Sequence, residues 1–155
     1  MSNDERKELP DFVMLRQRYQ SMAPGQRAEL RRVEKPDDLS FAPALYRLFP
    51  GARPNDRHKR VAFFLPWCEQ AKGSPPGLGK QLVDKRISET RVLQVSRARS
   101  PLDLIQFRQL IMHVEPVVNW EKFGRLLWFW ESQDKRVIVE DFYIAKFDNP
   151  NGGKK

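Results

Sequence analysis

The chain has 155 residues, of which 40% are hydrophobic, and its 28 Lys and Arg against 20 Asp and Glu give a formal charge of +8. This length predicts one domain or two small helical bundles, and the apolar content excludes a wholly disordered chain. The basic excess favours a polyanionic partner such as nucleic acid. A basic protein without any polyanionic partner is the simpler alternative.

The cysteine content and the N-terminus exclude several other classes of protein. Cys68 is the only cysteine, so an intramolecular disulfide and a thiolate zinc site are both ruled out. The polar segment 1–8 does not resemble a signal peptide, and no stretch approaches the roughly 20 apolar residues that a membrane span needs. We therefore expect a cytoplasmic protein with no membrane partner.

Helical periodicity dominates the first half of the chain, and no segment shows sustained strand alternation. We expect helices at about 11–21 and 26–33, followed by a short helix capped by Ser40. Asn55 is the predicted cap of a longer helix that reaches about Ala71 and that Pro66 bends or splits. The Gly- and Pro-rich segment 73–80 is then a loop between two halves.

The second half carries denser helix signals. Ser88 opens a helix to about Arg97, and Ser100 caps one that begins at Pro101 and runs to about His113. Further helices are expected at 120–132, after Asn119, and at 135–147. The prediction is an all-α fold of two small bundles packed together, 9–72 and 81–147, with short connections and flexible tails at 1–8 and 148–155.

Clusters of basic residues are the main functional signal. The run Arg57-His58-Lys59-Arg60 lies near a helix N-terminus, where cations oppose the helix dipole, so helix stability does not explain it. Arg97 and Arg99 fall at a corner between two helices, either compensating the dipole of the first or binding an anion. Arg108 falls within an apolar arc, where it either pairs with Asp103 or Glu115 or reaches a phosphate.

Residues with catalytic potential are scarce. His58 and His113 are the only histidines and lack a metal-binding spacing, while Glu140 and Asp141 diverge by about 100° on a helix. We therefore expect no catalysis, metal, cofactor or small-molecule substrate. The aromatic run 128–130 is expected to pack against other helices or a subunit rather than onto bases.

Several segments, in order, resemble the CasB family, the small subunit of the type I-E CRISPR RNA-guided complex Cascade. The matching segments are Leu30-Arg31-Arg32-Val33, Pro43-Ala44-Leu45-Tyr46-Arg47-Leu48, Asn55-Asp56-Arg57-His58, Arg91 to Arg99, His113-Val114-Glu115-Pro116-Val117 and Glu140-Asp141-Phe142. Each motif is loose, but their order and spacing cover roughly 26–145.

The resemblance implies a non-catalytic, all-helical subunit that is present as a pair in an antiviral complex and helps to hold an R-loop open. The implied partners are the other Cascade subunits, a second copy of the chain, the guide RNA and the target DNA, including its displaced strand. The residues expected to contact nucleic acid are Arg57, Arg97, Arg99 and Arg108, then Arg31, Arg32, Arg47, Arg125, Lys59, Lys80 and Lys85.

Two other functions stay open from the residues alone. A stand-alone helical DNA-binding regulator needs an exposed recognition helix after a tight turn, and the helix after Ser100 looks too apolar for that role. A metal-dependent nuclease needs converging carboxylates, which the scattered acidic residues do not provide.

Overall fold

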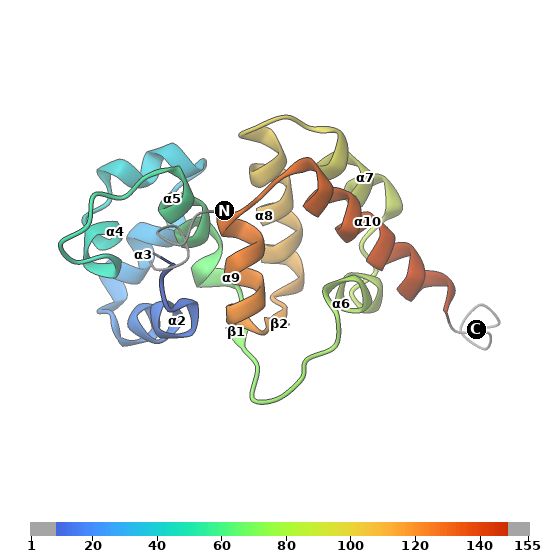
Figure 1. The fold of residues 1–155 in the computed structure, drawn as a ribbon, viewed down its shortest axis with the longest axis horizontal. Coiled ribbons are helices and arrows are strands. Elements are labelled where there is room, and N and C mark those ends of the chain that lie inside the picture. Colours follow the sequence, from blue (N-terminus) through green and yellow to red (C-terminus); the bar gives the residue numbers. More distant parts are fainter. Residues whose placement is uncertain (1–8, 149–155) are drawn as a thin grey trace.

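Helices dominate the computed structural model, which describes residues 9–148 (Figure 1). The all-α prediction is confirmed. The tails predicted at 1–8 and 148–155 lie outside the described residues, apart from Asp148. The first half of the chain forms α2 (Phe12–Ser21), α3 (Pro24–Arg32), the 3-10 helix η1 (Pro36–Phe41), α4 (Pro43–Leu48), α5 (Asp56–Phe64) and the 3-10 helix η2 (Leu65–Trp67).

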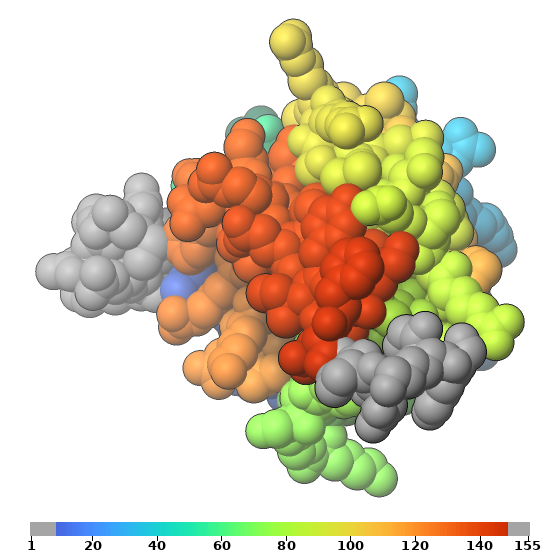
Figure 2. Space-filling view, turned by 90° about the vertical axis from the view of Figure 1, so that its right-hand side faces the viewer, coloured from blue at the N-terminus to red at the C-terminus, as the bar shows by residue number. Residues whose placement is uncertain are grey.

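The second half builds around two central helices. Its elements are α6 (Leu78–Asp84), α7 (Glu89–Arg97), α8 (Leu102–Val114), α9 (Trp120–Trp128) and α10 (Ser132–Phe147). Figure 1 shows α9 and α8 between the first-half helices on one side and α6, α7 and α10 on the other. Helix α10 packs on α6 and α7, and when the right-hand side of Figure 1 faces the viewer it lies across the centre of the surface (Figure 2).

Capping side chains explain where several helices begin, those of Asn55 and Asn119 as predicted. The side chains of Asp11, Asn55, Ser88 and Asn119 each accept a hydrogen bond from the first turn of α2, α5, α7 and α9. These caps satisfy backbone donors that have no partner within the helix.

Other predicted boundaries were wrong. Ser40 lies inside η1, and α4 instead begins after Ala42, with Pro43 in its first turn. Pro66 splits the predicted helix, as expected, but the helix does not reach Ala71: α5 ends at Phe64, and the chain leaves η2 in an extended conformation. Pro101 is the N-cap of α8 rather than its first helical residue. Helix α6 was not predicted, because its seven residues directly follow Gly and Pro residues that are typical of a loop; the predicted loop 73–80 therefore ends at Gly77.

A small strand pair joins two loops that lie far apart in the sequence. β1 (Glu69–Gln70) pairs in parallel with β2 (Val117–Val118). The side chain of Gln81 binds both backbone groups of Val117, donating to its oxygen at 2.8 Å and accepting from its nitrogen at 2.9 Å. Strands of two residues show no alternation, so periodicity did not predict them.

One hydrophobic core runs through both halves of the chain. Buried residues from the first half, such as Leu45 and Phe64, belong to the same cluster as Phe107 and Phe142 from the second. Helix α9 packs on α2 and α5, and the buried Trp120 donates its indole N–H to the Cys68 carbonyl oxygen at 2.9 Å. The division into bundles at 73–80 stays a prediction.

Gly79 sets the close approach of α6 to α10. A Cβ at Gly79 would lie 2.7 Å from the Phe142 nitrogen and would overlap the Asp141 carbonyl group, both of them backbone atoms that cannot rotate away. Gly79→Ala should therefore lower the free energy of unfolding by about 1–3 kcal/mol, measured by urea denaturation. Gly77→Ala is the matched control, since nothing lies within 4 Å of its added methyl. Equal stabilities of the two variants would contradict this packing.

Candidate nucleic-acid interface

The basic run at the start of α5 is held in place by its cap. The Asn55 side-chain oxygen accepts from the Arg57 nitrogen at 2.9 Å, and the Asn55 N–H donates to Nδ1 of His58 at 3.0 Å. The imidazole of His58 also meets the rings of Phe49 and Trp128 edge-to-face, with centroids 4.7 and 4.9 Å away. Burial lowers the pKa of His58, so at neutral pH the charge of the run comes from its three other members.

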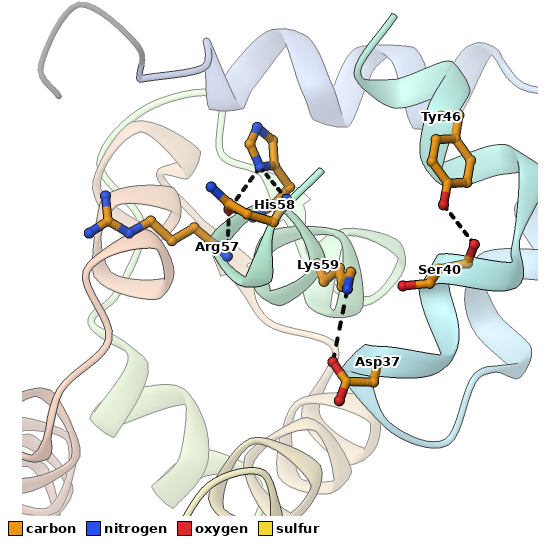
Figure 3. Close-up of polar contacts among 7 residues, drawn as sticks. Asp37, Ser40, Tyr46, Arg57, His58 and Lys59 are labelled. Carbon is orange, nitrogen blue, oxygen red and sulfur yellow. Dashed lines mark hydrogen bonds and ion pairs between the residues drawn. The ribbon is translucent and has the colours of Figure 1, made fainter. Parts of the chain in front are cut away.

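Two of these cations are engaged by the protein itself. Lys59 lies 4.0 Å from the Asp37 carboxylate, and Figure 3 shows its side chain leaning toward that residue. Arg60 donates from Nη2 to the Trp128 carbonyl oxygen at 2.9 Å, which ties α5 to the end of α9. Burial is the main cause that lowers the pKa of Arg60.

Arg57 is different, because no carboxylate of the described residues lies within ion-pair distance of it. Its guanidinium carbon lies 5.6 Å from the centroid of the Phe129 ring. Figure 3 shows the side chain reaching away from α5. Arg57 is therefore a positioned cation that is free to bind an external anion.

A surface hollow of about 190 Å³ brings the α5 run beside the corner between α7 and α8. We call it the α5–α8 hollow, and it is lined by Lys35, Pro36, Asp37, Asp56, Lys59, Arg60, Ser100, Pro101 and Leu104. Its three cations outnumber its two carboxylates, and the N-terminus of α8 opens at its edge. Such an arrangement favours an anion. Sequence analysis did not single out Lys35, which only the fold brings to this place.

Arg97 and Arg99 lie at the same corner and are both exposed. Arg97 ends α7, and Arg99 directly precedes Ser100 of the α5–α8 hollow. Lys135 of α10 donates to the Ala98 carbonyl oxygen at 2.9 Å, so a lysine already satisfies this end of α7. Neither arginine is needed to compensate that carbonyl. Arg97 lies near Tyr143 of α10, where it opposes the rise that Glu89 causes in the pKa of the Tyr143 hydroxyl.

The corner between α7 and α8 is stabilised by the buried carboxylate of Asp103. Asp103 is 2% exposed, its Oδ2 lies 3.2 Å from Nζ of Lys135, and the same oxygen accepts from Nε1 of Trp130 at 2.9 Å. On α8 taken alone, Asp103 lies on the polar face of the helix, where it would be exposed. The fold instead brings α10 and the end of α9 over that face, and their polar groups satisfy the carboxylate.

Arg108 is buried at 7% exposed, as its place in an apolar arc predicted. Its guanidinium carbon lies 3.9 Å from the Phe63 ring centroid, and neither Nε nor Nη1 has a hydrogen-bond partner. The alternative pairing with Asp103 or Glu115 was wrong, because Asp103 binds Lys135 and no ion pair joins Arg108 to either carboxylate. Burial lowers the pKa of Arg108 to about 10, against the opposing effect of Glu34, so the group stays charged at neutral pH.

The remaining predicted arginines neither line the α5–α8 hollow nor adjoin a residue that does. Arg31 donates from Nη1 to the Tyr19 hydroxyl at 3.0 Å, while Arg32 is exposed at the end of α3. Arg47 lines a separate hollow between α2 and α4, and Arg125 lines another beside the start of α2. These side chains lie on other parts of the surface.

The two predicted lysines of α6 are also separate from this site. Nζ of Lys80 lies 2.7 Å from a carboxylate oxygen of Asp84, an exposed pair one helical turn apart. Lys85 is exposed at the end of α6. Of the predicted residues only Lys59 lines the α5–α8 hollow. Arg57 and Arg99 are each next in sequence to a residue that lines it, Asp56 and Ser100, and the other candidates lie elsewhere.

The described residues offer little for catalysis. Among them no group of three His, Cys, Asp or Glu side chains is arranged to hold a metal ion. Cys68 is fully buried, and burial raises the pKa of its thiol. Over the same residues, no helix has the length and apolar character needed to cross a membrane.

Lys135 should be essential to the stability of the corner. Lys135→Met keeps the apolar length but leaves the Asp103 carboxylate buried without its cation, which should cost about 3 kcal/mol of unfolding free energy. Urea denaturation measures this loss. Adding Asp103→Asn should restore part of it, and Arg136→Met, at an exposed neighbouring position, is the control. A loss no larger than that of the control would contradict the role of the pair.

Comparison with known proteins supplies the family. No model of a protein family matches the chain. The CRISPR system Cascade subunit CasB of Escherichia coli strain K12 is 32% identical over 156 residues, covering 90% of this chain and 96% of that protein. A chain in the crystal structure of E. coli Cascade bound to a PAM-containing dsDNA target has a TM-score of 0.76 at 31% identity and covers 87% of this chain. The chain therefore belongs to the CasB family of CRISPR Cascade subunits.

Proposed function

We propose that this CasB-family chain is a non-catalytic subunit that stabilises an R-loop through sequence-independent contacts to nucleic acid. The observation that carries the proposal is the α5–α8 hollow, where Lys35, Lys59 and Arg60 outnumber two carboxylates. Arg57 adjoins its Asp56 in the sequence, and the exposed Arg97 and Arg99 lie shortly before its Ser100. Its ligand is the phosphate backbone, chiefly that of the displaced strand and also that of the guide–target duplex. Its protein partners are the other Cascade subunits and a second copy of the chain.

Physical chemistry supports backbone contact rather than base reading. Strand exchange between DNA duplex and guide–target duplex is nearly balanced in free energy, so a few phosphate contacts are enough to favour the open state. Base reading in a major groove instead needs an exposed recognition helix. Helix α8, which follows the turn at Ser100, buries Leu104, Phe107 and Ile111 in the core, so it is unavailable to a groove.

The triple variant Arg57→Ala/Arg97→Ala/Arg99→Ala tests this proposal. Affinity for single-stranded DNA should fall for all sequences alike, and the slope of log K against log salt should become shallower by about 2, roughly 0.7 for each lost contact. Anisotropy titrations of labelled oligonucleotides at several salt concentrations measure both quantities.

The matched control removes the same number of charges elsewhere. Lys72, Lys122 and Lys146 are exposed and neither line the α5–α8 hollow nor adjoin a residue that does, so replacing all three with alanine should change the slope much less. A loss confined to particular sequences, or an equal loss in the control, would count against the proposal.

Arg108 is tested separately because it is buried. Arg108→Met keeps apolar contact with Phe63 while removing the charge, so stability should be unchanged or raised. If Arg108 contributes a phosphate contact, affinity should fall several-fold at an unchanged melting temperature. A parallel loss of melting temperature and affinity would assign this arginine to the core instead.

A further inference from the structure

The pairing of Arg57 with Phe129 distinguishes this cation from the others around the α5–α8 hollow. Lys59 faces a carboxylate and Arg60 binds a backbone oxygen, whereas the Arg57 guanidinium lies 5.6 Å from an aromatic centroid. A guanidinium over a ring is attracted to the negative face of its π system and tends to lie flat on it. Phe129 therefore orients Arg57 without neutralising it.

Phe129 is itself fixed by its neighbours in the chain. Trp128 is buried, with its ring 6.1 Å from that of Phe12. Trp130 stacks on Phe107 at 5.4 Å with an interplanar angle of 15°, and its indole N–H binds Asp103. The Phe129 N–H also donates to the Arg125 oxygen at 3.0 Å, which closes the last turn of α9. A residue anchored on both sides is a rigid support for a flat group.

We propose that the Arg57–Phe129 pair is a stacking site for one unpaired nucleobase, which lies on the face of the guanidinium turned away from Phe129. This inference rests on the proposed function and adds a second kind of contact to it. Arg57 and Lys59 lie two residues apart on α5, so the stacked base is on a different side of the helix from Lys59 and the α5–α8 hollow (Figure 3).

The stacking site has a consequence for which nucleic acids bind. Every base has a π face, so stacking on a guanidinium tolerates any sequence. Bases within a duplex are already stacked on their neighbours and cannot present that face without being pulled out. The surface therefore prefers a displaced single strand to a duplex of the same charge, while remaining blind to base identity.

The experiment compares two single-stranded oligonucleotides of equal length and charge, one intact and one in which every base is replaced by an abasic site. The full chain should bind the intact strand roughly tenfold more tightly, the usual effect of one stacked base. A 2-aminopurine base in the intact strand should lose fluorescence on binding. Both strands should share one salt slope, since they carry the same phosphates.

Two variants test whether the preference for the intact strand over the abasic strand comes from the Arg57–Phe129 pair. Phe129→Leu removes the aromatic support, and Arg57→Lys keeps the charge without the flat guanidinium. Both should bind the two strands about equally while retaining the salt slope of the wild type. Phe147→Leu, which removes an exposed phenylalanine at the end of α10, is the control and should keep the tenfold preference. If Phe129→Leu lowers the melting temperature, its loss of preference could come from misfolding, and the result for Arg57→Lys then tests the stacking site.

The outcomes separate this inference from the function on which it rests. Equal affinity of the wild type for the two strands, with a steep salt dependence, would overturn the stacking site and leave the phosphate contacts standing. A preference that persists in both variants would place the stacking elsewhere and overturn it too. Failure of the wild type to bind either strand at low salt would overturn both.

Discussion

The buried carboxylate of Asp103 is the interaction on which the arrangement of the interface depends. It joins the first turn of α8 to Lys135 of α10 and to Trp130 beyond α9, and Lys135 in turn holds the end of α7. A carboxylate at 2% exposed is tolerated only with a cation and hydrogen bonds around it, so these four helices cannot shift independently. The corner that carries Arg97 and Arg99 is thereby fixed beside α5.

The cations of the chain are of two kinds, those that bind the protein itself and those that are free to bind a ligand. The first kind donates a hydrogen bond to a backbone carbonyl oxygen in another element of the fold; its members are Arg16, Arg18, Arg60 and Lys135. Their charge is part of the fold, because removing any of them would leave that oxygen unsatisfied. The formal charge of +8 therefore overstates what a ligand meets, and the position of each cation matters more than the sum.

Helix caps, which act between neighbouring residues, could be predicted from the sequence, whereas contacts between residues far apart in the chain could not. Capping residues such as Asn55 and Ser88 act within one turn, so the starts of α5 and α7 were predicted correctly. The pairing of Asp103 with Lys135, and the meeting of Lys35 with α5, arise from helices far apart in the chain. For the interface, the excess of cations at a helix start pointed to Arg57, but only the fold separates it from Arg60.

A surface of this kind suits a complex in which base pairing with a guide reads the sequence. A protein contact that favoured particular bases would make opening easier at some targets and harder at others, and so would add a second, unwanted layer of selection. Phosphate contacts avoid this because the backbone is uniform, and stacking avoids it because every base has a π face. The one property such contacts distinguish is whether the strand is paired. Arg57 lies over the Phe129 ring with no carboxylate of the described residues at ion-pair distance, and in the proposed stacking site it responds to that difference.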